Sequence, residues 1–204
     1  MKKSILLAAS FMLFSLFVVA QDEEEKEKRP FKENLFTGGS ISLQFFNNTF
    51  MVGGNPVFGY SLTNWVDAGI VVNYNYTSYR DPNISDYRLR QKTYGGGGFV
   101  KLYPLKFLFV QAQLEHNFIR QKEKLSGGTT INRPKFDVGS FLVGGGYTTG
   151  REGRGGQPFF YLAVLFDVSG DQNSPYTDNL GRTIPIVRGG LQIPLFQGQQ
   201  GRRR

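Results

Sequence analysis

Two residues of the chain have the chemistry to form a nucleophilic pair. His116, the only histidine, lies in an alternating apolar run, and Ser140 lies on a neighbouring predicted strand. A serine beside a histidine base can attack a lipid ester, as in lipid deacylases and acyltransferases. A solitary histidine near a strand end is more often incidental, so we predict no catalytic residues and no enzyme. The absence of cysteine excludes thiolate nucleophiles and thiolate metal sites, and we expect no cofactor.

Two glycine runs, at 95–98 and 144–146, have the composition of phosphate-binding loops. Such loops need a strand–loop–helix setting and a lysine, and neither accompanies these runs. Glycine within a strand instead permits close packing and strong curvature. We therefore assign both runs to strands.

Charged residues within the predicted strands form a second group. Buried charges need partners of opposite sign, and two bases here can offset three acids inside a closed sheet. Eight strands enclose an interior that side chains just fill, so we predict a lumenal charge network. The alternative is a narrow polar path for small solutes. The network residues are Asp67, Lys101, Glu115, Asp167 and Arg188.

Basic residues flank one long predicted loop, with Glu123 between them, and Arg80, Arg88 and Arg90 flank another. Cations near an anionic membrane surface each gain about 1 kcal/mol, so this collar can contact the phosphates of lipopolysaccharide or an acidic partner. The alternative is that it only aids solubility and snorkels to the membrane surface. The collar residues are Arg120, Lys122, Lys124, Arg133 and Lys135.

Alternating apolar and polar residues dominate the chain from Leu35 onward. They predict eight strands of roughly 11 to 16 residues, whereas globular strands average about five or six. A strand that crosses a bilayer needs about 9 to 11 residues plus its interfacial ends. The predicted strands are 36–46, 49–62, 65–79, 90–104, 106–121, 135–149, 158–169 and 183–196.

The faces and connections of these strands follow a pattern. Val72 and Tyr74 alternate with Asn73 and Asn75, whereas the strand at 135–149 has apolar residues in both phases, so its register stays open. Transmembrane barrels have short periplasmic turns and longer extracellular loops. The compact connections are 63–64, 104–105 and 151–156, and the longer polar ones are 80–89, 122–134 and 170–182.

The first twenty residues differ from the rest. Lys2 and Lys3 precede an apolar run that ends in small residues at Ala20, which is typical of a cleavable secretory signal peptide. Residues 21–34 are acidic and highly charged and predict a disordered leader. We expect the barrel at 35–196 and a basic C-terminal tail at 197–204.

A soluble barrel also alternates, with its apolar face turned inward, so alternation alone leaves both classes open. Strand length, loop asymmetry and aromatic residues towards strand ends favour a membrane barrel, because aromatic girdles mark both membrane interfaces. A mean hydropathy of −0.29 excludes a bundle of membrane helices. We predict an all-β, eight-stranded antiparallel up-and-down transmembrane β-barrel. The aromatic residues in question are Tyr74, Tyr76, Tyr94, Phe118, Tyr147 and Phe160.

Residues near the C-terminus complete a family pattern. A polar–x–Gly–x–x–apolar–x–apolar strand is formed by Arg188, Gly190, Ile193 and Leu195, with Phe196 following. With the alternating strands and the signal peptide, it makes residues 34–196 resemble the small eight-stranded outer-membrane β-barrel proteins of Gram-negative bacteria, in their porin-like, Bacteroidetes-type form. The resemblance implies recognition of this strand by the barrel assembly machinery. The tail departs from the pattern, since many members end at the final aromatic.

These observations predict an integral outer-membrane protein with a structural or partner-binding role in the cell envelope. Its expected partners are outer-membrane lipids, lipopolysaccharide, the assembly machinery and an envelope protein. Export argues against nucleic acid, although the net charge is +8. A narrow solute channel and an interfacial lipid-modifying enzyme are the alternatives.

Overall fold

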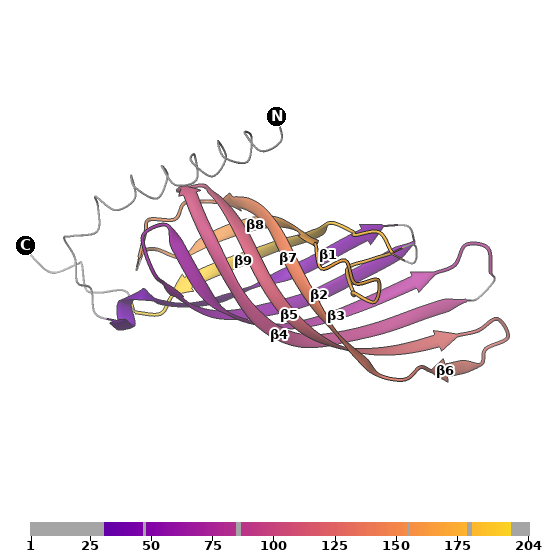
Figure 1. The fold of residues 1–204 in the computed structure, drawn as a ribbon. Coiled ribbons are helices and arrows are strands. Elements are labelled where there is room, and N and C mark those ends of the chain that lie inside the picture. The colour runs from indigo at the N-terminus through magenta and orange to yellow at the C-terminus, as the bar shows by residue number, and fades with distance from the viewer. Residues whose placement is uncertain (1–30, 47, 85–86, 155, 179–180, 197–204) are drawn as a thin grey trace, which may run out of the picture. The chain divides into compact units, whose positions relative to one another are not determined.

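The computed structural model describes residues 31–46, 48–84, 87–154, 156–178 and 181–196 (Figure 1). The predicted signal peptide, the basic tail and most of the predicted leader lie outside these residues. The end of the leader, Phe31–Asn34, forms a 3-10 helix (η1) rather than disordered chain. It is held because Asn34 is buried and its amide donates to the hydroxyl of Tyr60 at 3.1 Å. No helix in the described ranges is long and apolar enough to cross a membrane.

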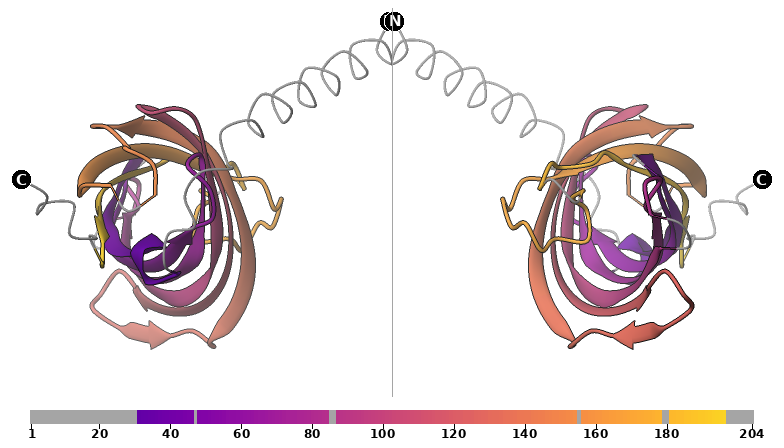
Figure 2. Two further views of the ribbon diagram at one scale, coloured as in Figure 1. Left: turned by 90° about the vertical axis from the view of Figure 1, so that its left-hand side faces the viewer. Right: turned by 90° about the vertical axis from the view of Figure 1, so that its right-hand side faces the viewer.

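Nine strands occur within these ranges, and eight of them close into a barrel. Consecutive barrel strands pair antiparallel, and the ring closes where β1 pairs with β9 (Figure 2). This confirms the predicted eight-stranded antiparallel up-and-down barrel. The ninth strand, β6, pairs only with the far end of β5. The strands are β1 (Leu35–Phe46), β2 (Thr49–Ser61), β3 (Val66–Arg80), β4 (Arg88–Leu105), β5 (Leu108–Lys124), β6 (Thr130–Asn132), β7 (Phe136–Thr148), β8 (Phe159–Asp167) and β9 (Ile186–Pro194).

The wall of the barrel is apolar outside and polar inside. Ile70, Leu114 and Phe160 point outward and are 60–63% exposed, whereas Asn73 and Asn75 point inward and are at most 1% exposed. A soluble barrel has the opposite arrangement. An outward apolar band around a polar interior is the arrangement of a transmembrane barrel, whose surroundings are lipid.

The structure determines the register of β7, which alternation left open. Val138 and Leu142 are buried inside, while Phe141 and Val143 face outward. Both phases are apolar because this part of the lumen holds an apolar cluster rather than polar side chains. The cluster consists of Met51, Leu142, Leu165, Tyr176 and Ile186.

The two ends of the barrel differ. The connections at 62–65, 106–107 and 149–158 lie at the end where the described chain begins and finishes, and those at 81–87, 125–135 and 168–185 lie at the other. Strands β4 and β5 extend beyond the rim at that second end (Figure 1). The short strand β6, which the sequence did not predict, pairs with the extension of β5.

One predicted turn was wrong. The turn between β4 and β5 is Lys106–Phe107, because Pro104 and Leu105 continue β4 after a register shift, and Leu105 pairs with Leu108. Proline is tolerated in a strand at such an irregularity, so it did not end the strand here.

Glycines in β4 and β7 allow neighbouring strands to approach closely. A Cβ atom on Gly97 would lie 1.7 Å from the carbonyl oxygen of Leu114, and one on Gly144 would lie 2.0 Å from that of Val164. A larger residue at either position would push the backbones apart. The two glycine runs are therefore part of the wall.

Candidate functional site

The middle of the lumen is organised around Glu115 on β5. Its Oε1 atom lies 3.0 Å from Nη2 of Arg188 on β9, and both residues are at most 4% exposed. The amides of Asn73 and Asn117 each donate to Oε2 at 3.1 Å, and the amide of Gln113 donates to Oε1. Burial of a carboxylate is costly unless it is paired and hydrogen-bonded, so these donors keep a charged Glu115 stable inside the barrel.

The loop at 168–185 enters the barrel above this pair. Tyr176 is fully buried, and its hydroxyl donates to Oε2 of Glu115 at 2.6 Å. Two residues earlier, the Ser174 hydroxyl donates to Asp167 and lies 3.3 Å from the hydroxyl of Ser140. The loop therefore plugs the lumen. The sequence predicted only a long polar loop here, since nothing local shows that Tyr176 reaches a strand more than sixty positions away.

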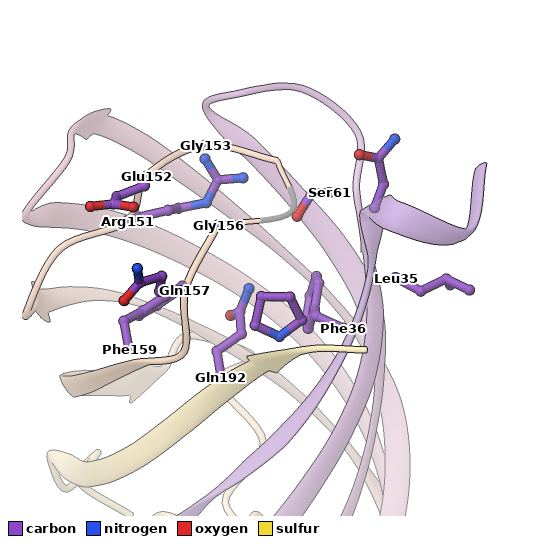
Figure 3. Close-up of a pocket in the computed structure, with 12 residues that line it drawn as sticks. Leu35, Phe36, Ser61, Arg151, Glu152, Gly153, Gly156, Gln157, Phe159 and Gln192 are labelled. Atoms are coloured by element: carbon purple, nitrogen blue, oxygen red, sulfur yellow. The ribbon is translucent and has the colours of Figure 1, made fainter. Parts of the chain in front are cut away.

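Asp67 organises the opposite end of the lumen. Its Oδ1 atom lies 2.6 Å from Nη2 of Arg151, and the amide of Gln192 donates to Oδ2 at 2.9 Å. The Arg151 guanidinium also donates to the backbone carbonyl groups of Thr63 and Asn64. These hydrogen bonds connect the turn at 149–158 to the turn at 62–65. Arg151 and Gln192 face a cavity of about 10 Å³ (Figure 3). Such a volume holds about one water molecule.

The two other predicted network residues have different partners from those expected. Lys101 is buried with its ammonium group 4.0 Å from the ring centroid of Tyr161 and 5.3 Å from that of Phe109. Asp167 accepts from the backbone amides of Phe141 at 3.1 Å and Ser169 at 2.9 Å. Lys101 also lines a second interior cavity of about 10 Å³.

All five predicted network residues therefore lie inside the barrel, but only Glu115 and Arg188 pair with each other. The partner of Asp67 is Arg151, which sequence reasoning placed only in a turn.

The potential nucleophilic pair does not form. His116 faces outward, with Nε2 3.2 Å from Oδ2 of Asp137 and its ring 5.1 Å from that of Phe118. Ser140 is 2% exposed and faces the lumen. The two side chains lie on opposite faces of the wall, so Ser140 cannot use His116 as its base.

Three cross-strand pairs of like charge lie on the outer face of β4 and β5. Within the ranges that the structure describes, none of these six side chains forms an ion pair with a carboxylate. We call them the basic ladder. The pairs are Lys92 with Arg120, Arg90 with Lys122, and Arg88 with Lys124.

The basic ladder begins where a bilayer crossing would end. Crossing takes about 9 to 11 residues, and outward positions on β5 from Leu108 to Phe118 are apolar apart from His116. The rings of Phe118 and Tyr94 stack at 5.7 Å, as expected for an aromatic girdle, and the guanidinium of Arg120 lies 5.2 Å from the Tyr94 ring centroid. The first rung of the ladder therefore lies directly above the girdle.

Only three of the predicted collar residues belong to the ladder. Arg133 has its own partner, with Nη2 2.8 Å from Oε2 of Glu123. Lys135 is exposed just before β7. Sequence reasoning noticed Arg88 and Arg90 but assigned them to another loop, because the pairing that brings them to β5 depends on the antiparallel register.

Tyr87 belongs to the same rim. Its hydroxyl donates to Oε1 of Glu123 at 2.6 Å, and this hydrogen bond raises the pKa of Tyr87 to about 12.

The last barrel strand, β9, has residues that face the lumen and residues on the outer surface. Arg188 points into the lumen, while Ile193 faces outward, and Leu195 and Phe196, which follow β9, are exposed. A Cβ atom on Gly190 would lie 2.6 Å from the hydroxyl of Tyr161. The pattern in the sequence therefore corresponds to one lumenal charge, one close contact and an outer apolar edge.

No protein-family model matches the sequence. No curated protein is similar to it in sequence either. Several solved structures resemble the chain at low sequence identity, among them the following three. The attachment invasion locus protein Ail of Yersinia pestis is 9% identical, with a TM-score of 0.49, over 78% of this chain and 97% of that one. Neisserial surface protein A is 9% identical, with a TM-score of 0.43, over 79% and 96%. The N-terminal β-barrel domain of Pseudomonas aeruginosa OprF is 13% identical, with a TM-score of 0.43, over 78% and 96%.

These likenesses are too distant to assign an activity, so the function of this chain has to follow from its own residues. The finer resemblance to porin-like, Bacteroidetes-type barrels stays a prediction.

Proposed function

We propose that the chain is an integral outer-membrane β-barrel protein that binds the phosphate groups of lipopolysaccharide through its basic ladder. The observation that carries this proposal is three stacked pairs of like charge at the upper edge of the apolar band. The proposed binding site consists of Arg120, Lys122 and Lys124 from the predicted collar, together with Arg88, Arg90 and Lys92 on β4.

The ladder carries an electrostatic cost in the absence of a ligand. Like charges directly opposite each other on a sheet are destabilising, and the described part of the chain supplies no carboxylate to them. An anion between the rungs would remove this repulsion. Phosphates suit this role because they accept charge-assisted hydrogen bonds from Arg and Lys.

The depth of the ladder selects the anion. The ladder lies on the outer face of the wall, directly above the Tyr94–Phe118 girdle, and not in the lumen. A molecule that reaches it is therefore a component of the surrounding membrane or a protein docked on that membrane. The phosphates of lipopolysaccharide lie at this level, at the interface of the outer leaflet.

The interior supports a structural or docking role rather than transport. Tyr176 plugs the lumen above Glu115, and two interior cavities hold about one water each. The loops above the ladder are then available to an envelope protein, which cross-linking in native outer membrane would capture.

Export and assembly belong to the same proposal. Residues 1–20 act as a cleaved signal peptide, and β9 is read by the barrel assembly machinery as the terminal strand of a porin-like, Bacteroidetes-type barrel. Replacing Phe196 by Ala and measuring the fraction of folded barrel in cells tests the second part.

The ladder is tested by titrating lipopolysaccharide onto the full chain in lipid nanodiscs. One variant replaces Arg90, Lys92, Arg120, Lys122 and Lys124 by Gln. Each base near an anionic surface contributes about 1 kcal/mol, so this variant should bind lipopolysaccharide at least about tenfold more weakly. Binding to the wild type should also fall at high salt, because exposed charges are screened over about 8 Å at physiological ionic strength.

The matched control removes five other bases, which are Lys32, Lys106, Arg202, Arg203 and Arg204. It should bind like the wild type. Lipopolysaccharide without its lipid A phosphates should bind both the wild type and the control weakly. If the ladder variant and the control bind lipopolysaccharide equally well, the ladder is only a solvated rim.

A further inference from the structure

The loop end of the barrel holds a cavity of about 500 Å³, which we call the outer vestibule. Side chains of β1, β2, β3, β4, β5 and β7 line it, together with part of the loop at 168–185 that plugs the lumen. Pockets that hold small organic molecules measure about 300 to 1,000 Å³. The residues that matter below are Gln44, Thr77, Tyr79, Gln91 and Gln121.

Two polar atoms beside the vestibule lack partners. Gln44 is 4% exposed and its Nε2 atom has no hydrogen-bond partner among the described residues. The Oγ1 atom of Thr77, which lines the same cavity, also has none there. Buried donors without partners are costly and uncommon in folded proteins. Both atoms lie behind the lining rather than on its surface, so contacts with a ligand fall to the other amides of the vestibule.

The other polar groups of the lining are amides and hydroxyls. The amide of Gln121 donates to Oε1 of Gln91 at 2.8 Å, which leaves further donors and acceptors on both side chains. Tyr79 and Tyr87 add aromatic side chains to the lining. An amide offers a donor and an acceptor side by side, and this arrangement matches neighbouring hydroxyl groups of a sugar ring.

The charge of the lining argues against an anionic ligand. Its described residues include no Lys, Arg or His, and they include Asp81 and Asp178. Asp178 already pairs with Arg182, with Oδ2 2.7 Å from Nη2. Phosphate or sulfate groups would therefore meet the carboxylate of Asp81 and no cation among the described lining residues.

We propose that the outer vestibule binds a neutral, hydroxyl-rich ligand, namely an uncharged segment of a glycan. The hydroxyl groups pair with the amides of Gln91 and Gln121, and the sugar ring packs on Tyr79. This site is independent of the basic ladder, which lies on the outer face of the wall. The two sites also differ in the charge of their ligands.

The proposal is tested by applying the full chain in detergent micelles to an array of neutral and acidic glycans. We expect the wild type to retain neutral glycans, and the retained glycan is then titrated in solution. Gln121→Met should weaken its binding by about tenfold, which is the upper range for one lost hydrogen bond. Gln91→Met should weaken it as well, because Gln91 supplies the neighbouring amide of the same lining.

The matched control is Gln111→Met, which changes a lumenal glutamine below the vestibule, 7% exposed. It should bind the glycan like the wild type. Retention of no glycan, or of acidic glycans alone, would overturn the proposal. An equal loss of binding in Gln111→Met and Gln121→Met would also overturn it, because the effect would then come from the fold. None of these outcomes depends on lipopolysaccharide binding by the ladder.

Discussion

At the scale of single residues, Glu115 contacts five polar side chains among the described residues of the lumen, which are Asn73, Gln113, Asn117, Tyr176 and Arg188. Replacing it by Ala leaves the buried guanidinium of Arg188 without its carboxylate. Removing one partner of a buried ion pair costs about 3–5 kcal/mol. We expect Glu115→Ala to lower the free energy of unfolding by this amount, measured by urea titration in lipid vesicles.

The double variant Glu115→Gln, Arg188→Met is the control, because it removes both charges and keeps an acceptor for the groups that donate to residue 115. It should recover much of the lost stability, since no buried charge is then left without a partner. Equal losses in the single and double variants would show that the pair itself is not what the barrel needs.

Tyr87 provides a prediction about pH. Its raised pKa of about 12 means that the contact with Glu123 stabilises the rim fully below the ordinary value of 10 and is lost as the pH rises through 12. The phenolate absorbance of the wild type minus that of Tyr87→Phe should therefore show a midpoint near 12. A midpoint near 10 would mean that the hydrogen bond is absent in solution.

The side of the wall that a residue faces could be predicted from the sequence wherever strand alternation determines it. Alternation alone puts Asp67, Glu115 and Arg188 on the lumenal face. It cannot find Arg151 or Tyr176, because both lie in connections, where no periodicity indicates direction. Their partners are 84 and 61 positions away in the chain.

At the scale of strands, the two faces of the wall should respond differently to a charge. Val72 and Val164 face lipid, and so does Ala112 on β5. An Arg at the bilayer midplane on this face costs about 2–4 kcal/mol. We expect Val72→Arg, Val164→Arg and Ala112→Arg each to lower the folded fraction in vesicles.

The comparison is Asn73→Arg, in the lumen beside Glu115. Its effect should come from packing inside the lumen, and other lumenal positions should not become more sensitive to arginine towards the bilayer midplane. If arginine is tolerated equally at every outward position, the assigned lipid face is wrong.

Strand existence and phase could be predicted because the run lengths and alternation are local. The exact ends could not. Pro104 indicated a turn, but a register shift carries β4 through it, and the partner that allows this, Leu108, belongs to the next strand. The phase of β7 needed the apolar cluster around Tyr176, and β6 exists only because β5 extends beyond the rim.

At the scale of the whole molecule, we expect the protein to fractionate with the outer membrane. A closed barrel unfolds reluctantly in detergent, since every strand of the wall is paired on both sides. Unheated and boiled samples should therefore migrate differently on gels. Recovery as a soluble periplasmic protein would contradict the transmembrane assignment.

The pairing of β1 with β9 joins the first strand of the barrel to the last, from Phe36–Pro194 to Leu43–Val187. Until β9 is available, both free edges would present unpaired N–H and C=O groups to lipid, each costing several kcal/mol. The chain therefore cannot enter the membrane one strand at a time during synthesis. It must stay unfolded in water until its last barrel strand has been made, and then insert and close as one cooperative unit. A chain truncated before Ile186 would lose the entire membrane fold rather than one strand.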